Sequence, residues 1–178
     1  IFETTNETIN KISNTVSPQG IVATCPLPQQ KTPNLLQNNN WLYLDHINDP
    51  GNLGTMLRNT TWFGLTNVAL SPECADPHAS KTIRSGAGAH FHLSIFRNIK
   101  LSKYNKKIFN IIGTDQTGIS LSETLSQTSN PWVLVLGNES HGISPKNRPL
   151  LTKTISIPKK GEGESLNLAV AGGIFLYE

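Results

Sequence analysis

The sequence predicts an α/β protein with a mostly parallel sheet covered by helices on both faces. Short apolar runs rich in β-branched and aromatic residues recur along the chain, and stretches of helical or loop character separate them. Strands that alternate with helices are typical of parallel sheets. Five runs carry this pattern: Trp41–Leu44, Val68–Leu70, Ile108–Ile112, Trp132–Leu136 and Thr154–Ile157.

The composition agrees with one such domain. The chain has 178 residues, of which 37% are hydrophobic and 15% charged, which is enough to bury one core. No apolar run approaches 18 residues and no signal peptide opens the chain, so we expect no membrane contact and a cytoplasmic location. The two cysteines, Cys25 and Cys74, form no metal-ligand pattern, so we expect reduced thiols and no metal site.

The first part of the chain differs from the rest. Residues 1–18 are polar with weak periodicity, Gly20–Cys25 is a short apolar run that predicts a strand, and Pro26–Asn40 reads as a connector. The chain opens on Ile rather than Met, so we expect sequence before it.

The stretches between the predicted strands give the helices. We expect them at Leu53–Phe63, Ala79–Ser85 and Leu121–Ser126, with a short one near Pro145–Leu151. A last helix follows the loop Lys159–Glu164, with Ser165 as its N-cap and apolar residues at helical spacing up to Tyr177. This helix is rich in Ala and Gly, and adjacent glycines suggest that it presses closely on a neighbouring element.

Basic residues are bunched although the net charge is only +3. Two stretches, residues 97–107 and 146–160, hold five basic residues each and no acid. Such bunching is expected of a protein that binds a polyanion, the alternative being two solvated surface runs. The basic residues are Arg97, Lys100, Lys103, Lys106 and Lys107, then Lys146, Arg148, Lys153, Lys159 and Lys160.

The first candidate site segment is Asn48–Gly64. It follows a predicted strand and breaks at a Pro-Gly pair, after which we expect Asn52 to cap a helix and Gly64 to end it. Arg58 lies beside the apolar stripe of this helix, near the carboxyl edge of the sheet, where open α/β sheets bind ligands. The alternative is an ordinary surface arginine. The segment contains neither a dinucleotide-binding nor a Walker fingerprint.

The second candidate segment is Val133–Ser144, in which a buried strand runs straight into Gly137. Two glycines bracket polar residues, which suggests backbone close to a bound molecule. Glu139 is placed to cap a helix, to pair with Arg58 or to hold a ligand. His141 has no Asp or Cys at a catalytic or metal spacing, so we expect an exposed loop histidine. No G-x-S-x-G elbow supports a serine hydrolase.

Read together, these loops resemble the three signature motifs of the SpoU (TrmH-like) family of RNA 2′-O-ribose methyltransferases, in the SPOUT superfamily. The matching segments are DPGNLGTMLRN, LVLGNESHGIS and IPKKGEGESLNLAVA, in the family's order. The resemblance makes residues 31–178 the SPOUT methyltransferase domain, and residues 1–30 the tail of an N-terminal RNA-binding domain with its linker. One departure is Lys159, where relatives often carry Met.

The resemblance implies a function and a fold that the pattern alone does not give. The implied reaction is methyl transfer from S-adenosylmethionine to a ribose 2′-hydroxyl in structured RNA, ribosomal RNA in preference to transfer RNA. The implied fold has a deep trefoil knot at its C-terminal end, an exception to the usual connection rules. The family also implies a homodimer with its active site near the subunit interface.

The motifs assign candidate roles to particular residues. A guanidinium stays protonated, so we expect Arg58 to hold a phosphate and stabilise the developing alkoxide rather than act as a base, with Glu139 and Asn52 fixing its fork. Ser165 and Asn167 would complete the catalytic set by orienting substrate and loop. The implied cofactor-binding residues are Thr114, Asp115, Gln116, Leu136, Gly137, Asn138, Gly142, Ile157, Ser165 and Leu166.

Two other functions remain open from the sequence. The first is a non-catalytic RNA-binding protein that keeps the knotted fold, although the intact set of Arg58, Glu139, Ser165 and Asn167 argues against it. The second is methylation of a base nitrogen in transfer RNA, which the Asn52-to-Arg58 element disfavours because that element belongs to the ribose-methylating group.

Overall fold

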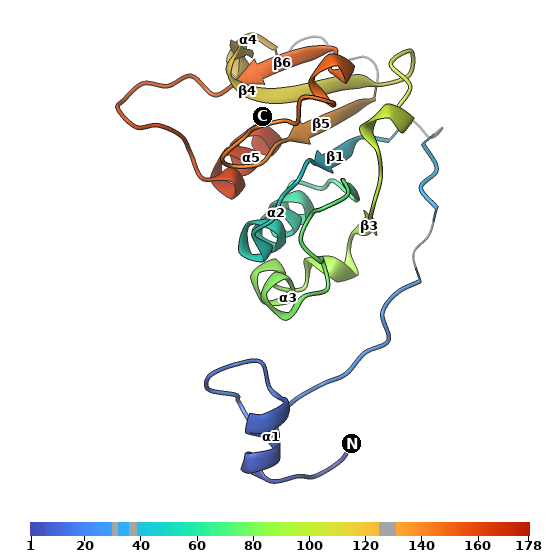
Figure 1. Cartoon of the computed structure of the whole chain (residues 1–178), viewed down its shortest axis with the longest axis vertical. Helices are drawn as coiled ribbons and strands as arrows, with labels where there is room; N and C mark the ends of the chain where they lie inside the picture. Colours follow the sequence, from blue (N-terminus) through green and yellow to red (C-terminus); the bar gives the residue numbers. More distant parts are fainter. Residues whose placement is uncertain (30–31, 36–38, 125–130) are drawn as a thin grey trace.

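The protein is built on a six-stranded sheet in which every paired neighbour is parallel. The computed structural model describes residues 1–29, 32–35, 39–124 and 131–178. The strands lie in the order β3-β2-β1-β5-β4-β6 (Figure 1). Their bounds are β1 Trp41–Leu44, β2 Asn67–Leu70, β3 Ser94–Phe96, β4 Asn110–Ser120, β5 Trp132–Leu136 and β6 Lys153–Ser156.

The helices follow the predicted alternation. The α-helices are α1 Asn6–Ile12, α2 Pro50–Trp62, α3 Ser80–Gly86, α4 Leu121–Thr124 and α5 Leu168–Tyr177, and the 3₁₀ helices are η1 Ala89–Phe91, η2 Leu101–Lys103 and η3 Arg148–Leu150. The predicted strand at Gly20–Cys25 is wrong, because those residues are exposed and unpaired with the sheet. Residues 125 and 126 of the predicted fourth helix lie outside the described residues.

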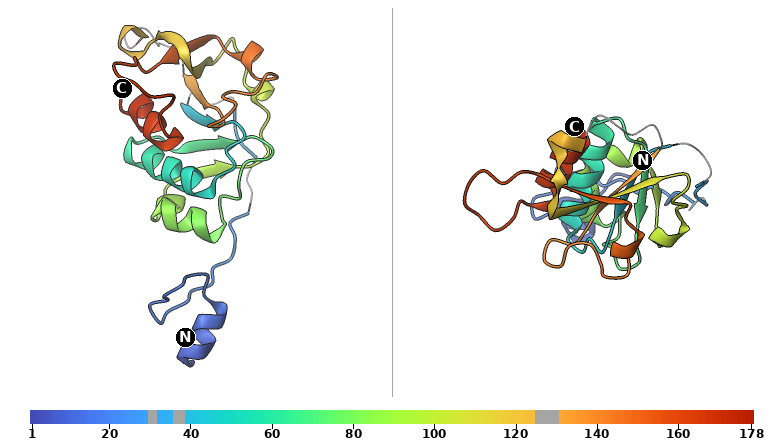
Figure 2. Two further views of the ribbon diagram at one scale, coloured as in Figure 1. Left: turned by 60° about the vertical axis from the view of Figure 1, so that its left-hand side comes forward. Right: turned by 90° about the horizontal axis from the view of Figure 1, so that it is seen from above.

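Two hydrophobic clusters cover the two faces of the sheet. All four residues of β1 are buried, as expected for a central parallel strand. Leu42 and Leu44 point into a first cluster that α2 and α5 cover. Trp41 and Tyr43 point into a second cluster that η2, η3 and their loops cover. The second face therefore has 3₁₀ helices where the first has α-helices, and Figure 2 shows the two groups on opposite sides of the sheet.

Helix α2 begins three residues earlier than the sequence predicts. Asp49 is its N-cap, since the Asp49 carboxylate accepts a hydrogen bond of 2.7 Å from the backbone N–H of Asn52. Pro50 then occupies the first helical position, where its missing N–H costs nothing. The predicted cap at Asn52 is therefore wrong, and the Asn52 side chain is released for other contacts. Gly64 has a φ of +78° just past the helix, as predicted for its C′ position.

Helix α5 also begins at a different cap. Asn167 and not Ser165 is the N-cap, because Asn167 Oδ1 accepts from the backbone N–H groups of Ala169 at 2.9 Å and Val170 at 3.3 Å. The predicted close approach of the small residues is confirmed. A Cβ added to Gly172 would lie 2.4 Å from the sulfur of Met56 on α2. Helix α5 therefore packs so closely on α2 that any larger residue at this position would require the Met56 side chain to move.

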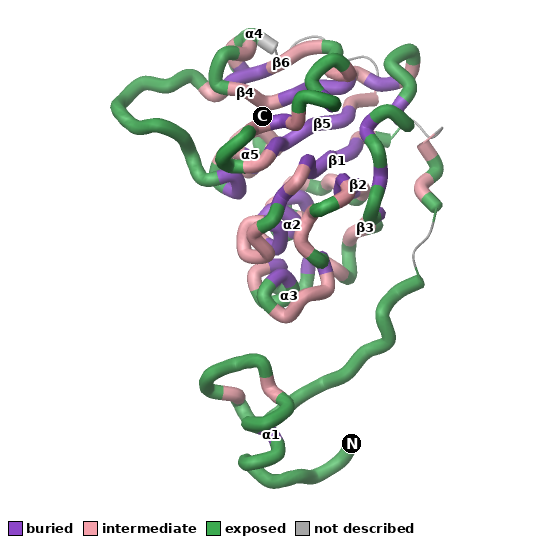
Figure 3. Tube along the Cα trace, in the orientation of Figure 1, coloured by how far each residue is buried: buried purple, intermediate pink, exposed green. Residues whose placement is uncertain are grey.

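Residues 1–29 stand apart from the sheet in Figure 3, and most of them are exposed. Hydrogen bonds from Asn14 Nδ2 to Ser80 Oγ, 2.8 Å, and from Arg84 to the Asn14 carbonyl, 3.4 Å, connect this segment to α3. The boundary predicted between residues 30 and 31 falls outside the described residues, so the two-domain division stays a prediction, as does the trefoil knot. None of the described helices has the length and apolar character that a membrane crossing requires.

Candidate active site

Three loops leave the carboxyl edge of the sheet next to one another. The register pairs Leu44 of β1 with Leu136 of β5, and the N–H of Asp45 continues this pairing with a 2.8 Å bond to the Leu136 carbonyl. The loop after β1 and the loop after β5 therefore start side by side. A hydrogen bond of 2.9 Å from Asn138 Nδ2 to the His46 carbonyl joins them further out.

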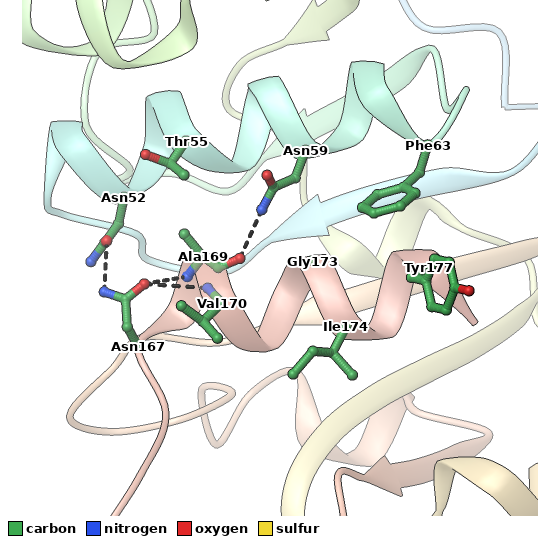
Figure 4. Close-up of a pocket in the computed structure, with 10 residues that line it drawn as sticks. All are labelled: Asn52, Thr55, Asn59, Phe63, Asn167, Ala169, Val170, Gly173, Ile174 and Tyr177. Carbon is green, nitrogen blue, oxygen red and sulfur yellow. Dashed lines mark hydrogen bonds between the residues drawn. The ribbon is translucent and has the colours of Figure 1, made fainter.

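Side chains from all three motifs meet in one hydrogen-bonded chain at this edge. Asn52, on the first turn of α2, donates through Nδ2 to Glu139 Oε1 at 2.5 Å. Asn167, at the start of α5, donates through Nδ2 to Asn52 Oδ1 at 3.0 Å (Figure 4). The Asn167 oxygen is occupied by the N-terminal N–H groups of α5, so the direction of each bond in the chain is fixed. Three of the five predicted catalytic residues are thus brought together.

Arg58 and Ser165 lie outside this hydrogen-bonded chain. Arg58 is exposed, and its guanidinium bonds to none of the described residues. Glu139 and Asn52 bond to each other, and neither bonds to Arg58, so the prediction that they orient the Arg58 guanidinium stays a prediction. Arg58 lies six positions after Asn52, which is about 9 Å along the helix axis, and the two side chains point in different directions. Ser165 is exposed in the loop before α5.

The glycines of the second loop serve the loop itself. An isolated bridge joins Asn138 to Gly142, and a Cβ on Gly137 would lie 2.2 Å from the Gly142 carbonyl carbon. Gly137 therefore allows the loop to fold back on its own backbone, which is a different reason for glycine from the predicted approach of a bound molecule. The Asn138 side chain stabilises the turn by accepting from Ser140 N at 2.9 Å. His141 is exposed, as predicted.

The buried carboxylate of Asp45, which the sequence analysis does not identify, binds the segment that follows β5. Asp45 is fully buried and accepts from the N–H of Ser144 at 2.8 Å and from Asn147 Nδ2 at 2.9 Å. The sequence does contain a signal for this residue, since Asp45 is an acid that directly follows the apolar run Trp41–Leu44. Because both Asp45 oxygens bind the segment that follows the second loop, this carboxylate fixes the first motif against the second.

The end of β4 reaches the other cofactor-binding candidates. Thr114 Oγ1 donates to the Val135 carbonyl at 3.2 Å, Asp115 pairs with Arg148 at 3.3 Å, and Gln116 Nε2 donates to the Glu164 carbonyl at 2.9 Å. The last bond ties β4 to the loop that precedes α5. Nearby, Leu166 is 52% exposed, so this loop offers apolar surface beside backbone polar groups.

These features fit a nucleoside-like ligand such as S-adenosylmethionine. An apolar side chain left exposed beside loop backbone suits a heterocyclic base, and backbone groups suit its polar edges. Among the described residues, no group of three or more His, Cys, Asp or Glu side chains is placed to hold a metal ion.

A groove of about 500 Å³ runs between α2 and α5 from the hydrogen-bonded chain toward the C-terminus. Asn59 spans it, with a bond of 2.8 Å from its Nδ2 to the Ala169 carbonyl, and Phe63 stacks edge-on with Tyr177 at its far end (Figure 4). The sequence reasoning missed Thr55, Asn59 and Phe63, although all share the α2 face of Asn52 at helical spacing. The lining residues are Asn52, Thr55, Asn59, Phe63, Asn167, Ala169, Val170, Gly173, Ile174 and Tyr177.

Comparison with known protein families identifies the family of this chain. The SpoU rRNA Methylase family matches residues 39–177, which include all three loops. The chain belongs to this family. Its sheet, its two helices α2 and α5 and its three motif loops are accordingly those of a SpoU methyltransferase, and the predicted family is confirmed.

Relatives of known sequence agree with the SpoU assignment. The chain is 35% identical to the 23S rRNA (guanosine(2553)-2′-O)-methyltransferase RlmP of Bacillus subtilis over 96% of its length, covering 68% of that protein. It is 32% identical to an uncharacterized tRNA/rRNA methyltransferase of Synechocystis over 97% of its length, covering 64% of that protein. The chain thus spans about two thirds of each of these relatives.

Solved structures confirm the fold. A putative TrmH-family RNA methyltransferase of Porphyromonas gingivalis superposes with a TM-score of 0.85 at 33% identity, over 95% of this chain and 69% of that one. The SpoU methyltransferase AviRb of Streptomyces viridochromogenes, in complex with AdoMet, gives 0.71 at 27% identity over 79% of this chain and 56% of that one. The SpoU family thus uses S-adenosylmethionine, as predicted.

Proposed function

We propose that this SpoU methyltransferase transfers a methyl group from S-adenosylmethionine to a ribose 2′-hydroxyl in RNA, ribosomal RNA in preference to transfer RNA. The observation that carries the proposal is the hydrogen-bonded chain Asn167–Asn52–Glu139, which joins one polar side chain from each family motif. The similarity to RlmP, named as a 2′-O-methyltransferase of 23S rRNA, supports both the ribose hydroxyl and the ribosomal substrate. A cytoplasmic location stays a prediction.

In this reaction the protein must mainly orient the two reacting groups, and it needs to do little to activate the methyl group. The bound cofactor supplies a methyl group that is already electrophilic, so the protein must align the ribose hydroxyl with it and receive the proton. Asn52 and Asn167 hold the Glu139 carboxylate at the sheet edge through Oε1. The second Glu139 oxygen then accepts the hydrogen of the ribose hydroxyl.

Arg58 has a separate task in this scheme. Its guanidinium is always protonated and has no partner among the described residues, so it is available to an RNA phosphate. Arg58→Lys keeps the charge but loses the bidentate geometry, and we expect methyl transfer to fall at least tenfold with little change in cofactor affinity. Near-normal transfer by this variant would contradict the assigned role.

The cofactor would lie among the three loops and the end of β4. We assign its contacts to backbone and apolar groups of Leu136, Gly137, Ile157 and Leu166, with Thr114, Asp115, Gln116, Asn138, Gly142 and Ser165 around them. Supporting this placement, the bond from Gln116 to Glu164 and the bond from Asn138 to His46 keep the surrounding loops in fixed relation.

We further propose that the protein works as a homodimer. The groove between α2 and α5 is lined mainly by apolar side chains, and Val170 and Tyr177 along it are 53% and 75% exposed. A second copy would cover this surface beside the hydrogen-bonded chain. Light scattering tests the state, and Val170→Glu should convert a dimer to a monomer; a wild-type monomer at micromolar concentration would contradict the proposal.

The decisive experiment is methylation of total RNA with labelled S-adenosylmethionine by the full-length protein, followed by mapping of the modified nucleotide. We expect label on a ribose that resists alkaline cleavage, in ribosomal RNA. Label on a base would point to the base-methylating alternative. RNA binding without any cofactor binding by calorimetry would point to a non-catalytic RNA-binding protein.

A further inference from the structure

Two basic stretches that lie far apart in the sequence share one surface of the folded chain. Lys106 Nζ donates to the Pro149 carbonyl in η3 at 2.9 Å, which brings the loop before β4 against the loop before β6. Both loops pack on the second hydrophobic cluster, through Leu101 and Tyr104 on one side and Ile143 and Leu150 on the other. The first stretch and the beginning of the second therefore cover the same face of the sheet.

This surface extends along the strands, from the carboxyl edge of the sheet to its amino edge. Ile99 N donates to the carbonyl of Leu70, the last residue of β2, so Lys100 lies at the carboxyl edge. Lys146 lies at the same edge, 3.2 Å from His46 Nε2. Lys106 and Lys107 precede β4 and lie at the amino edge. We call this surface the basic face and define it by Lys100, Lys103, Lys106, Lys107 and Lys146.

The positive charge of the basic face is not neutralised within the chain. All five lysines are exposed, and among the described residues none pairs with a carboxylate. The neighbouring acids are engaged elsewhere, since Asp115 pairs with Arg148 at 3.3 Å and Glu73 lies 3.1 Å from His46 Nδ1. Five cations without a carboxylate partner on one face of a small domain attract a partner with many closely spaced negative charges.

The basic face lies outside the hydrogen-bonded chain of the methyl-transfer site. Helices α2 and α5, which carry Asn52, Arg58 and Asn167, cover the opposite face of the sheet. Lysine is a flexible point charge that contacts phosphates without reading sequence. Its arrangement across the sheet suits an extended polyanion that reaches the carboxyl edge and continues over the second face.

We propose that the basic face docks the phosphates of an RNA segment that flanks the methylated nucleotide. The proposal rests on the proposed function, which makes RNA the substrate. The nucleotide to be modified would enter at the carboxyl edge, and the adjoining duplex would pass Lys100 and Lys146 and run toward Lys106 and Lys107. Docking there supplies affinity without sequence specificity.

The test removes charges that make no structural contact. The side chains of Lys100, Lys103 and Lys107 bond to none of the described residues, so the triple variant Lys100→Gln, Lys103→Gln, Lys107→Gln should fold normally. Binding to transcribed 23S rRNA is measured in the full chain from about 50 to 200 mM salt. Each lost phosphate contact lowers the salt slope by about 0.9 on duplex, so we expect the slope to fall by roughly 2 to 3.

The matched control is the triple variant Lys100→Arg, Lys103→Arg, Lys107→Arg, because it changes the same side chains and keeps their positive charges. A single Lys103→Gln change should reduce the salt slope, and the triple arginine variant should leave it unchanged. An unchanged slope in the triple glutamine variant, with normal methylation, would overturn the basic face and leave the proposed function standing. A reduced slope in the triple glutamine variant, in a protein that neither binds the cofactor nor methylates RNA, would support the basic face as an RNA-binding surface and overturn the proposed function. Weaker binding to polyglutamate alone, with RNA binding intact, would also overturn it.

Discussion

Asn167 combines a structural contact and a site contact in one side chain, and two substitutions separate them. Its oxygen caps α5 by accepting from Ala169 N and Val170 N, and its nitrogen donates to Asn52 Oδ1. Asn167→Asp keeps the capping oxygen and removes the donor. Asn167→Ala removes both.

The sizes of the two effects follow from the bonds. Loss of an N-cap costs about 1 kcal/mol, so Asn167→Ala should lower the Tm by about 2 to 4 °C in a chain of this size. Asn167→Asp should leave stability within about 0.5 kcal/mol, because Asp caps as well as Asn. Loss of the bond to Asn52 is worth about 0.5 to 1.5 kcal/mol, so both variants should lose roughly 2- to 12-fold in methyl transfer.

The assay pairs thermal unfolding by circular dichroism with single-turnover methylation of 23S rRNA. Full activity in Asn167→Asp would refute the idea that Asn167 positions Asn52 and Glu139. An unchanged Tm in Asn167→Ala would refute the capping role. Asn10→Ala on the exposed N-terminal segment serves as the control and should change neither quantity.

Three further predictions address packing, thiols and pH. A Cβ at Gly54 would lie 2.3 Å from a backbone carbonyl of α3, so Gly54→Ala should destabilise by about 1 to 3 kcal/mol in a urea titration, despite a better helix former. Burial raises the pKa of the Cys74 thiol while Cys25 is exposed, so Ellman's reagent should modify one thiol quickly and the second only in denaturant. The hydrogen bond from Lys81 lowers the pKa of Asp49 in the folded protein. The stabilisation that the Asp49 carboxylate provides is therefore present above its pKa in the unfolded chain, and it is lost as the pH falls through its pKa in the folded protein. Asp49→Asn should make the urea midpoint depend less on pH between pH 7 and about 3.

Local sequence patterns predicted the central strands and most helices, because burial on both faces leaves continuous apolar runs such as Trp132–Leu136. The edge strand β3 escaped prediction, since it has three residues and Ser94 at its start is exposed. The caps of α2 and α5 were misplaced for one reason. Each helix start offers two good capping residues within a few positions, and Pro50 or the final backbone path decides between them.

The candidate site was predictable only through the family resemblance. The bond from Asn52 to Glu139 joins residues 87 apart, and the bond from Asn167 to Asn52 joins residues 115 apart. No local periodicity encodes such pairs. Asp45 shows the same limit, because its partners Ser144 and Asn147 lie about a hundred residues further along the chain.

The pairing of β1 with β5 has a consequence for how the chain is made. Leu42 pairs with Leu134, so one side of the most buried strand has no partner until β5, about 90 residues further along the chain, has left the ribosome. At 5 to 20 residues per second, about 5 to 20 s pass between the synthesis of the two strands. During that time β1 has apolar side chains and one edge of unpaired backbone N–H and C=O groups exposed, and contacts of such long range also form slowly. We therefore expect the nascent chain to depend on chaperones more than a helical protein of equal length.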